Sequence, residues 1–346
     1  MALVRVDEAR LMNRRNVAPA LVCTAAILFA STLPAAASTQ TSDARQSLDD
    51  AWWTGPLLAA SPGTLPQGHF LFEPYLYEAM LDGHYDSAGK RHSSAHENDF
   101  GSQSYILYGL VDTVTLGLIP RFGFKDPSLG SSSSGVGVGD VTLQAAYRLT
   151  QFQDAGWLPA MSFVAAETLP IGKYDRLGNN PSDGFGGGSY TTALSIYSQY
   201  YFWMPNGRIL RTRLDLTQSW SKDVDLRDVS VYGTPDGFRG RARPGNSSIV
   251  NLAFEYSMTR NWVAALDVIY EHDGSTRIVG QQPGSGANGL VDIHTESGSS
   301  QSFAFAPAIE YNWTSNVGVI IGAKVVTSGR NTAALVIPVA AVNLVF

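Results

Sequence analysis

Apolar and polar residues alternate along most of the chain after Gly68. In "DVTLQAAYRL", residues 140–149, the odd-numbered positions are apolar and the even-numbered positions are mostly polar or charged. A period of two is that of a β-strand with one apolar and one polar face. The pattern recurs in residues 210–220, 250–258 and 302–313, and twelve strand-like segments follow Gly68 in all. We therefore predict an all-β fold.

Short and long connections alternate between these segments, which is typical of an up-and-down antiparallel transmembrane β-barrel. A soluble β-sandwich also alternates apolar and polar residues, so alternation alone does not decide the environment. Tight turns are predicted at 111–113, 205–207, 259–261 and 314–316, with a longer one at 150–156. Gly/Ser/Asp-rich stretches near 79–98, 125–139, 169–188, 221–245 and 274–300 are predicted to be long outer loops.

Aromatic residues lie beside the short turns: residues 200–203 are Tyr-Tyr-Phe-Trp, and Trp262, Tyr311 and Trp313 flank the next two turns. Amphipathic rings favour the headgroup layer of a membrane, so this pattern favours an aromatic girdle. No segment beyond the first 37 residues has about 20 consecutive apolar residues, and we expect no helical span. These features favour a closed barrel of twelve strands in the bacterial outer membrane.

The last predicted strand, residues 331–346, is apolar on both faces and contains Pro338, which cannot donate a ladder hydrogen bond. An occluded lumen or a covering N-terminal segment would explain the two apolar faces. In a barrel this strand pairs with the first one and removes both sheet edges. Val342, Leu344 and Phe346 share one face and resemble the C-terminal signal that barrel assembly machinery reads, so we expect that machinery as a partner.

Composition adds an export signal. Arg14 and Arg15 precede an apolar run, and Ala35–Ala37 offer a small-residue cleavage site, so residues 1–37 read as a signal peptide. A lipoprotein interpretation of Cys23 is weaker because Cys23 lies inside the apolar run. We expect residues 38–67 to form an N-terminal periplasmic segment and residues 68–346 the barrel. Without residues 1–37 the net charge is −8, which argues against a nucleic-acid partner.

Charged residues are predicted on the inner face of several strands. They either line a polar path or form ion pairs that fill a narrow barrel, because twelve strands lie between filled eight-stranded barrels and open porins. Arg211 and Arg213 beside Asp215 are the candidate constriction. The predicted lumen-lining residues are Arg121, Arg148, Glu167, Arg211, Arg213, Asp215, Glu255, Asp267, Glu271, Glu310 and Lys324.

Other chemistries are not supported. His84, Asp86, His92, His96, Glu97 and Asp99 fall in the first predicted loop, but their spacing fits no defined metal site. His272 and Ser275 lie near each other without a nucleophile elbow. "GSSSSGVGVG", residues 130–139, lacks the Lys-Ser/Thr ending of a phosphate loop. We predict no enzyme activity, no metal and no cofactor.

Two segments carry a family resemblance. Residues 52–78 contain "TGPLL", then Pro66, Gly68 and His69, then "EPYLY"; residues 135–149, "GVGVGDVTLQAAYRL", form a Gly-rich approach to a strand that opens in Gly-Asp and closes in Tyr-Arg. Both resemble the MetA-pathway phenol-degradation family of bacterial outer-membrane proteins. The resemblance implies an outer-membrane β-barrel that takes up small molecules, including aromatic compounds.

We therefore predict an outer-membrane channel or transporter for passive or facilitated uptake of small molecules, with outer-membrane lipid and a small-molecule solute as partners. The alternative is a non-conducting surface protein that acts as a receptor, adhesin or structural barrel through its long loops.

Overall fold

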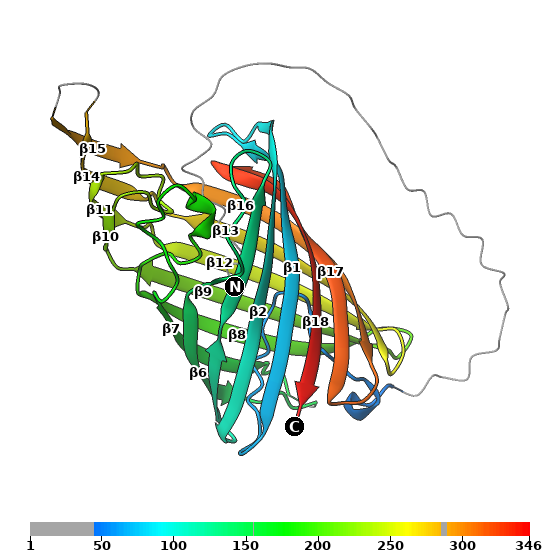
Figure 1. Cartoon of the computed structure of the whole chain (residues 1–346). Coiled ribbons are helices and arrows are strands. Elements are labelled where there is room, and N and C mark those ends of the chain that lie inside the picture. Colours follow the sequence, from blue (N-terminus) through cyan, green and yellow to red (C-terminus); the bar gives the residue numbers. More distant parts are fainter. Residues whose placement is uncertain (1–44, 155, 285–288) are drawn as a thin grey trace.

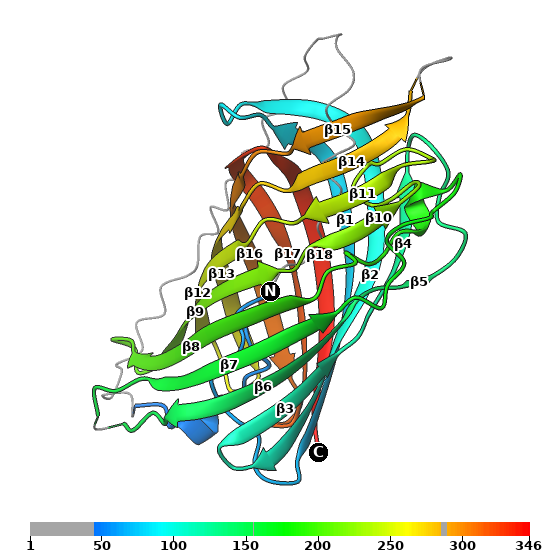
Figure 2. The ribbon, with the colours of Figure 1, turned by 90° about the vertical axis from the view of Figure 1, so that its left-hand side faces the viewer.

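The structure, a computed structural model, describes residues 45–154, 156–284 and 289–346. The predicted signal peptide, residues 1–37 with Cys23, lies outside the described residues. Within the described part of the chain, no helix is long and apolar enough to cross a membrane. The described residues form a closed, tilted barrel of antiparallel strands (Figures 1 and 2).

Twelve strands form the closed ring, which confirms the predicted fold class and strand number. β1 pairs with both β2 and β18, so the sheet has no free edge there. The ring runs through β1 (Phe70–Tyr85), β2 (Arg91–Val111), β3 (Val114–Ile119), β6 (Val141–Thr150), β7 (Ala160–Leu169), β8 (Thr191–Trp203), β9 (Ile209–Ser221), β12 (Ser247–Ser257), β13 (Trp262–Asp273), β16 (Ser300–Asn312), β17 (Val317–Arg330) and β18 (Thr332–Val345).

Side chains alternate between the lumen and the outer surface. Tyr75 on β1 is 5% exposed, whereas its neighbour Leu76 is 64% exposed. An apolar belt facing outward from a closed barrel suits the hydrocarbon of a bilayer. Exposed apolar side chains of this belt include Leu143, Phe163, Ile196, Leu216, Leu252, Phe305 and Ile321. The protein is thus built as an outer-membrane β-barrel.

Aromatic residues gather where the strands meet the short turns. Trp262 packs on Tyr311 with ring centroids 4.7 Å apart, and Tyr311 meets Trp313 at 5.2 Å. Near the preceding short turn, Tyr200 contacts Phe202 at 5.0 Å. This arrangement agrees with the girdle expected from the sequence.

The opposite end of the barrel differs from the prediction in its connections. The first predicted loop, 79–98, is instead a hairpin of two long strands with a turn at residues 86–90, where Asp86 and Lys90 are hydrogen-bonded through the backbone. The His and carboxylate residues near it therefore belong mostly to strands. A polar composition suggested a loop, but it also suits strands that extend beyond the bilayer.

Two further predicted loops, 221–245 and 274–300, contain strands. β10 (Val224–Arg227), β11 (Arg239–Arg243), β14 (Arg277–Pro283) and β15 (Leu290–Glu296) form a separate four-stranded sheet. In chain order, β10 follows β9, β11 precedes β12, β14 follows β13 and β15 precedes β16. The small sheet has the same strand order as these four barrel strands, so it prolongs the barrel wall (Figure 2). Val224, Leu226 and Ala242 of this sheet form a buried apolar cluster with Phe238, which directly precedes β11.

The remaining long connections lie at the same end of the barrel. β4 (Arg121–Pro127) pairs with β2 and with the short β5 (Gly137–Val138). Asp140 accepts N–H groups of Gly172 and Gly187, at 2.9 and 2.7 Å, and thus anchors the β7–β8 connection. Burial raises the pKa of Asp140, while these two hydrogen bonds oppose the rise.

Each of three prolines coincides with a gap in one strand ladder. On the β1–β18 side, the pairing skips positions 73–74 of β1 and 337–338 of β18, which contain Pro74 and Pro338. Pro307 of β16 pairs with Leu266 of β13, whereas the ladder to β17 skips it. A proline has no N–H to donate, so each of these prolines lacks a ladder hydrogen bond along one edge of its strand. The seam between the first and last strands is therefore interrupted twice.

Candidate functional site

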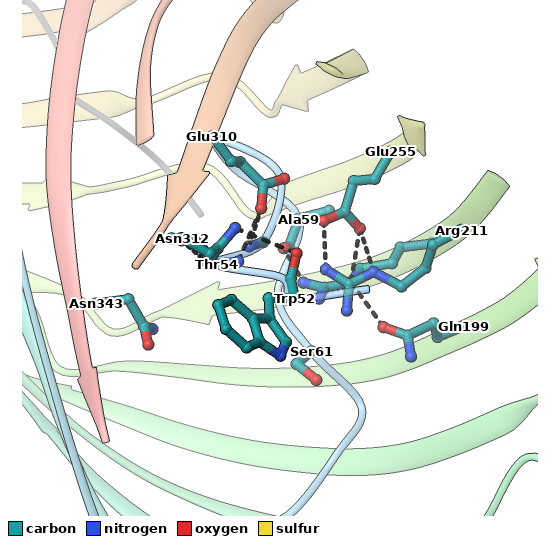
Figure 3. Close-up of polar contacts among 12 residues, drawn as sticks. Trp52, Thr54, Ala59, Ser61, Gln199, Arg211, Glu255, Glu310, Asn312 and Asn343 are labelled. Carbon is teal, nitrogen blue, oxygen red and sulfur yellow. Dashed lines mark hydrogen bonds and ion pairs between the residues drawn. The ribbon is translucent and has the colours of Figure 1, made fainter. Parts of the chain in front are cut away.

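A stretch of chain ahead of β1 enters the barrel. We name residues 51–60 the luminal segment (Figure 3). Leu57 and Leu58 are buried and pack against the inner face of the barrel. Before this segment, Trp203 donates to the carbonyl of Gln46 at the short-turn end, and after it Gln67 N–H donates to Asp112 at the β2–β3 turn. The segment therefore rises from the short-turn end and returns to it.

Wall side chains hold the beginning of the luminal segment. The Oε2 atom of Glu310 accepts the N–H groups of Thr54 and Gly55, at 2.7 and 3.2 Å. Asn312 accepts the Thr54 hydroxyl at 2.9 Å and donates to the carbonyl of Trp52 at 3.1 Å. Glu310 and Asn312 lie two residues apart on β16, so both face inward, and this one strand fixes four polar groups of residues 52–55.

Two aspartates and one arginine hold its end. Ala59 N–H donates to Asp267 Oδ1 at 2.8 Å, and Ala60 N–H donates to Asp215 Oδ2 at 2.6 Å. Arg213 Nη1 donates to the carbonyl of Ala59 at 2.9 Å. The luminal segment is irregular and does not pair in a strand ladder. These side chains therefore satisfy its backbone N–H and C=O groups instead.

A charged cluster lies beside the segment. Arg211 makes a two-pronged ion pair with Glu255 on the neighbouring strand, and all three of Arg211, Arg213 and Glu255 are buried. Arg213 also donates to Gln199 at 2.9 Å. The guanidinium of Arg211 lies 4.3 Å from the ring centroid of Trp53, which is a cation–π contact. These charges are thus bound to one another and to the segment.

The opposite wall of the lumen is apolar. Leu335, Ile337, Val339 and Ala341 of β18 face inward and belong to one cluster with Leu57 and Leu58. This contact accounts for the two apolar faces of the last strand: one faces lipid and the other faces the luminal segment. Burying apolar side chains of about this size stabilises by roughly 1.5–3 kcal/mol each.

Most predicted lumen-lining residues lie on the inner face. Arg211, Arg213, Asp215, Glu255, Asp267 and Glu310 surround the luminal segment, while Glu271 and Lys324 form a separate ion pair of 2.7 Å. Arg121 lies opposite inward-facing Gln103, and Arg148 lies opposite inward-facing Ser162, both away from this cluster. The assembly residues Val342 and Phe346 are exposed on the outside, with Leu344 partly exposed.

Glu167 is the exception, because it lies on the outer face. It is opposite Leu143, which faces outward, and it accepts a hydrogen bond from the hydroxyl of Thr192 at 2.6 Å. β7 has apolar residues at both parities from Met161 to Ala166, so alternation could not fix which face its only acid occupies.

Several uncharged or aromatic site residues were not predicted. Asn251, Asn312 and Gln199 are inward-facing amides that hold charged or backbone groups. Tyr75 and Tyr105 meet edge to face at 5.7 Å on the inner wall. Strand parity alone could have identified them, since each occupies the same parity as a charged lumen residue or a partner of one.

No group of three or more His, Cys, Asp or Glu residues that could hold a metal ion occurs in the described part of the chain. Near the first hairpin turn, His84 and His92 stack with ring centroids 5.3 Å apart. His92 pairs with Asp86 at 2.8 Å, and His84 pairs with Ser94 at 2.9 Å. These side chains therefore pair with one another across the hairpin.

Solved structures include similar barrels, whereas no curated protein matches the chain in sequence. The COG4313 outer membrane channel from Pseudomonas putida F1 is 18% identical over 83% of this chain and 98% of its own, with a TM-score of 0.62. The β domain of the Bordetella autotransporter BrkA is 10% identical over 81% and 100%, with a TM-score of 0.42. The toluene transporter TbuX from Ralstonia pickettii is 11% identical over 85% and 95%, with a TM-score of 0.35. Only the first likeness is close enough to support the fold.

A protein family also matches the chain in sequence. The family described as "Putative MetA-pathway of phenol degradation" matches residues 81–336, which is more than half of the chain. This match includes the Gly-rich approach to β6 and most of the barrel, and it confirms the resemblance predicted from the sequence. The chain belongs to the MetA-pathway phenol-degradation family.

Proposed function

We propose that the protein is an outer-membrane channel for passive uptake of small molecules, including aromatic compounds, and that the luminal segment narrows its path. The observation that carries the proposal is a closed barrel whose lumen holds a short irregular segment, fixed there by polar side chains of the wall. Family membership and the likeness to an outer membrane channel support the same function.

The two-sided lumen favours solutes with an apolar body and a polar substituent. When the luminal segment is displaced, the β18 side offers Ile337, Val339 and Ala341, and the β9 side offers Arg211 and Arg213, all of which are buried while the segment is in place. An aromatic ring can contact the first side while a hydroxyl or carboxylate hydrogen-bonds to the second. Arg211, Arg213 and Asp215 therefore remain our candidate constriction, together with the segment that they hold.

Single-channel recording in planar bilayers tests the proposal. Deleting residues 45–65 removes the luminal segment and keeps all the barrel strands, so we expect a conductance increase of severalfold over the full chain. Liposome swelling with phenol, benzoate, glucose and an amino acid then ranks the solutes, and we expect the aromatic compounds to enter fastest. Equal rates for solutes of equal size would contradict the aromatic preference.

A non-conducting surface protein is the second candidate, and the ordered sheet β10-β11-β14-β15 favours it because a rigid platform suits ligand binding at the cell surface. In that case deletion of residues 45–65 leaves the bilayer conductance at background. The heat-treated, unfolded protein serves as the blank in both experiments.

We also propose that residues 1–37 are removed on export and that Val342, Leu344 and Phe346 direct insertion by the assembly machinery. Cleavage is tested by N-terminal sequencing of the protein from outer membranes. Intact residues 1–37 in that fraction would contradict the first part.

A further inference from the structure

The wall around the luminal segment carries more negative than positive groups. Asp215, Glu255, Asp267 and Glu310 are buried there, and the buried guanidinium groups that contact this region are Arg211 and Arg213. The arginines engage Glu255 and the segment carbonyl of Ala59 most directly. Ionised carboxylates that are buried without a counter-charge are costly, so a surplus of this kind calls for a further positive group.

Among the described residues, four oxygen atoms of the same wall have no hydrogen-bond donor. One is Glu310 Oε1. The other three are Asp215 Oδ1, Asn251 Oδ1 and Asp267 Oδ2, and each of these belongs to a residue that is at most 7% exposed. The unpartnered amide oxygen of Asn251 is separate evidence from the surplus of carboxylates, because an amide carries no charge. A buried oxygen usually has a partner, so three together point to one shared partner.

The three residues are neighbours in the sheet. Asp215 on β9 lies directly opposite Asn251 on β12, and Asn251 Nδ2 donates to Asp267 Oδ1 at 3.0 Å. The Asn251 amide is thereby oriented with its nitrogen on Asp267, which leaves its oxygen for another partner. Two carboxylates and one amide, all inward-facing, thus occupy three adjacent strands.

We propose that Asp215, Asn251 and Asp267 form a binding site for a hard divalent cation such as Ca²⁺. Carboxylate and amide oxygens are the ligands that such cations prefer, and Ca²⁺ completes its coordination with water or backbone carbonyls. Asp215 and Asp267 use their other oxygens to hold Ala60 and Ala59. The bound cation therefore fixes the carboxylates that hold the luminal segment, and so it stabilises the segment in the lumen.

Calcium titration of the purified full chain tests the site. The protein in detergent is first stripped with a chelator, and Ca²⁺ binding is then followed by calorimetry. We expect one Ca²⁺ per chain, and we expect Asn251→Ala and Asp215→Asn each to weaken the affinity at least tenfold. Glu167→Gln is the matched control, because Glu167 lies on the outer face, and its affinity should equal that of the unmodified chain.

The measurement does not depend on conduction, so the site and the channel can fail separately. Absence of binding at several millimolar Ca²⁺ would overturn the site. Equal affinity in Asn251→Ala and the unmodified chain would overturn it too, even if Ca²⁺ binds elsewhere. If the thermal stability of the chelated protein rises as the pH falls and does not respond to Ca²⁺, protons rather than a cation neutralise the cluster, and the proposal is wrong.

Discussion

Glu255 receives two N–H groups from Arg211 on the neighbouring strand, and both side chains are buried. Removing one partner of a buried ion pair leaves the other charge uncompensated, which typically costs about 3–5 kcal/mol. We therefore expect Glu255→Ala to lower the free energy of unfolding by that amount, measured by urea unfolding in lipid vesicles.

The matched control is Asp225→Ala, which breaks the exposed pair with Arg241 on the small outer sheet. Exposed pairs contribute little because water screens them, so stability should stay the same within error. A comparable loss of unfolding free energy in both variants would show that the buried Glu255 pair contributes no more to stability than an exposed pair.

Gly55 lies at the bend where the luminal segment meets Glu310. Its φ is +127°, a conformation that side chains with a Cβ rarely adopt, and an added Cβ would lie 3.4 Å from Arg213 Nη1. We expect Gly55→Ala to loosen the segment and to raise single-channel conductance toward that of the deletion of residues 45–65.

Gly135 provides the control for this substitution, because it has no unusual φ and no heavy atom within 4 Å of an added Cβ. Gly135→Ala should leave conductance unchanged. An unchanged conductance in Gly55→Ala as well would mean that the bend tolerates a side chain or that the segment does not limit the current.

At the scale of the elements, β18 and β1 meet in a ladder that Pro74 and Pro338 interrupt. Pro338→Ala restores one N–H donor opposite β1, and a net hydrogen bond contributes about 0.5–1.5 kcal/mol. We expect slower amide hydrogen exchange in residues 76–81 of β1 and a higher unfolding temperature. Faster exchange would indicate that the proline ring stabilises the strand by packing instead.

Strands with strict alternation could be predicted from the sequence, whereas others could not. In β12, Asn251, Ala253 and Glu255 alternate with apolar residues, and the structure places the two sets on opposite faces. In β7 both parities are apolar, so Glu167 was placed on the wrong face. Polar strands beyond the bilayer, such as β10 and β15, resemble loops because neither of their faces needs to be apolar.

The contacts of the luminal segment also could not be predicted from the alternation of residues in the strands. Parity placed Asp267 and Glu310 on the inner face, but their partners are backbone N–H groups of the luminal segment, which has no period to read. The two-faced apolar pattern of residues 331–346 did indicate a covering element. It could not indicate that Leu57 and Leu58 supply it.

For the whole molecule, closure of twelve strands predicts resistance to detergent. Every strand in the ring has two hydrogen-bonded neighbours, so unfolding must break ladders on both sides of a strand. We expect the unboiled protein to migrate as a compact form on a denaturing gel and the boiled protein to migrate at its full mass. Identical migration of the two samples, with solubility in plain buffer, would contradict a membrane barrel.

The luminal segment and the barrel belong to one chain, and this sets how obstruction of the pore depends on concentration. Gln67 is fastened to Asp112 only seven residues beyond Ala60, so a displaced segment stays tethered beside the mouth. A short tether keeps a ligand at an effective concentration in the millimolar range. Dilution and expression level therefore leave the fraction of obstructed pores unchanged, and a free peptide copying residues 51–60 would compete only at millimolar concentration.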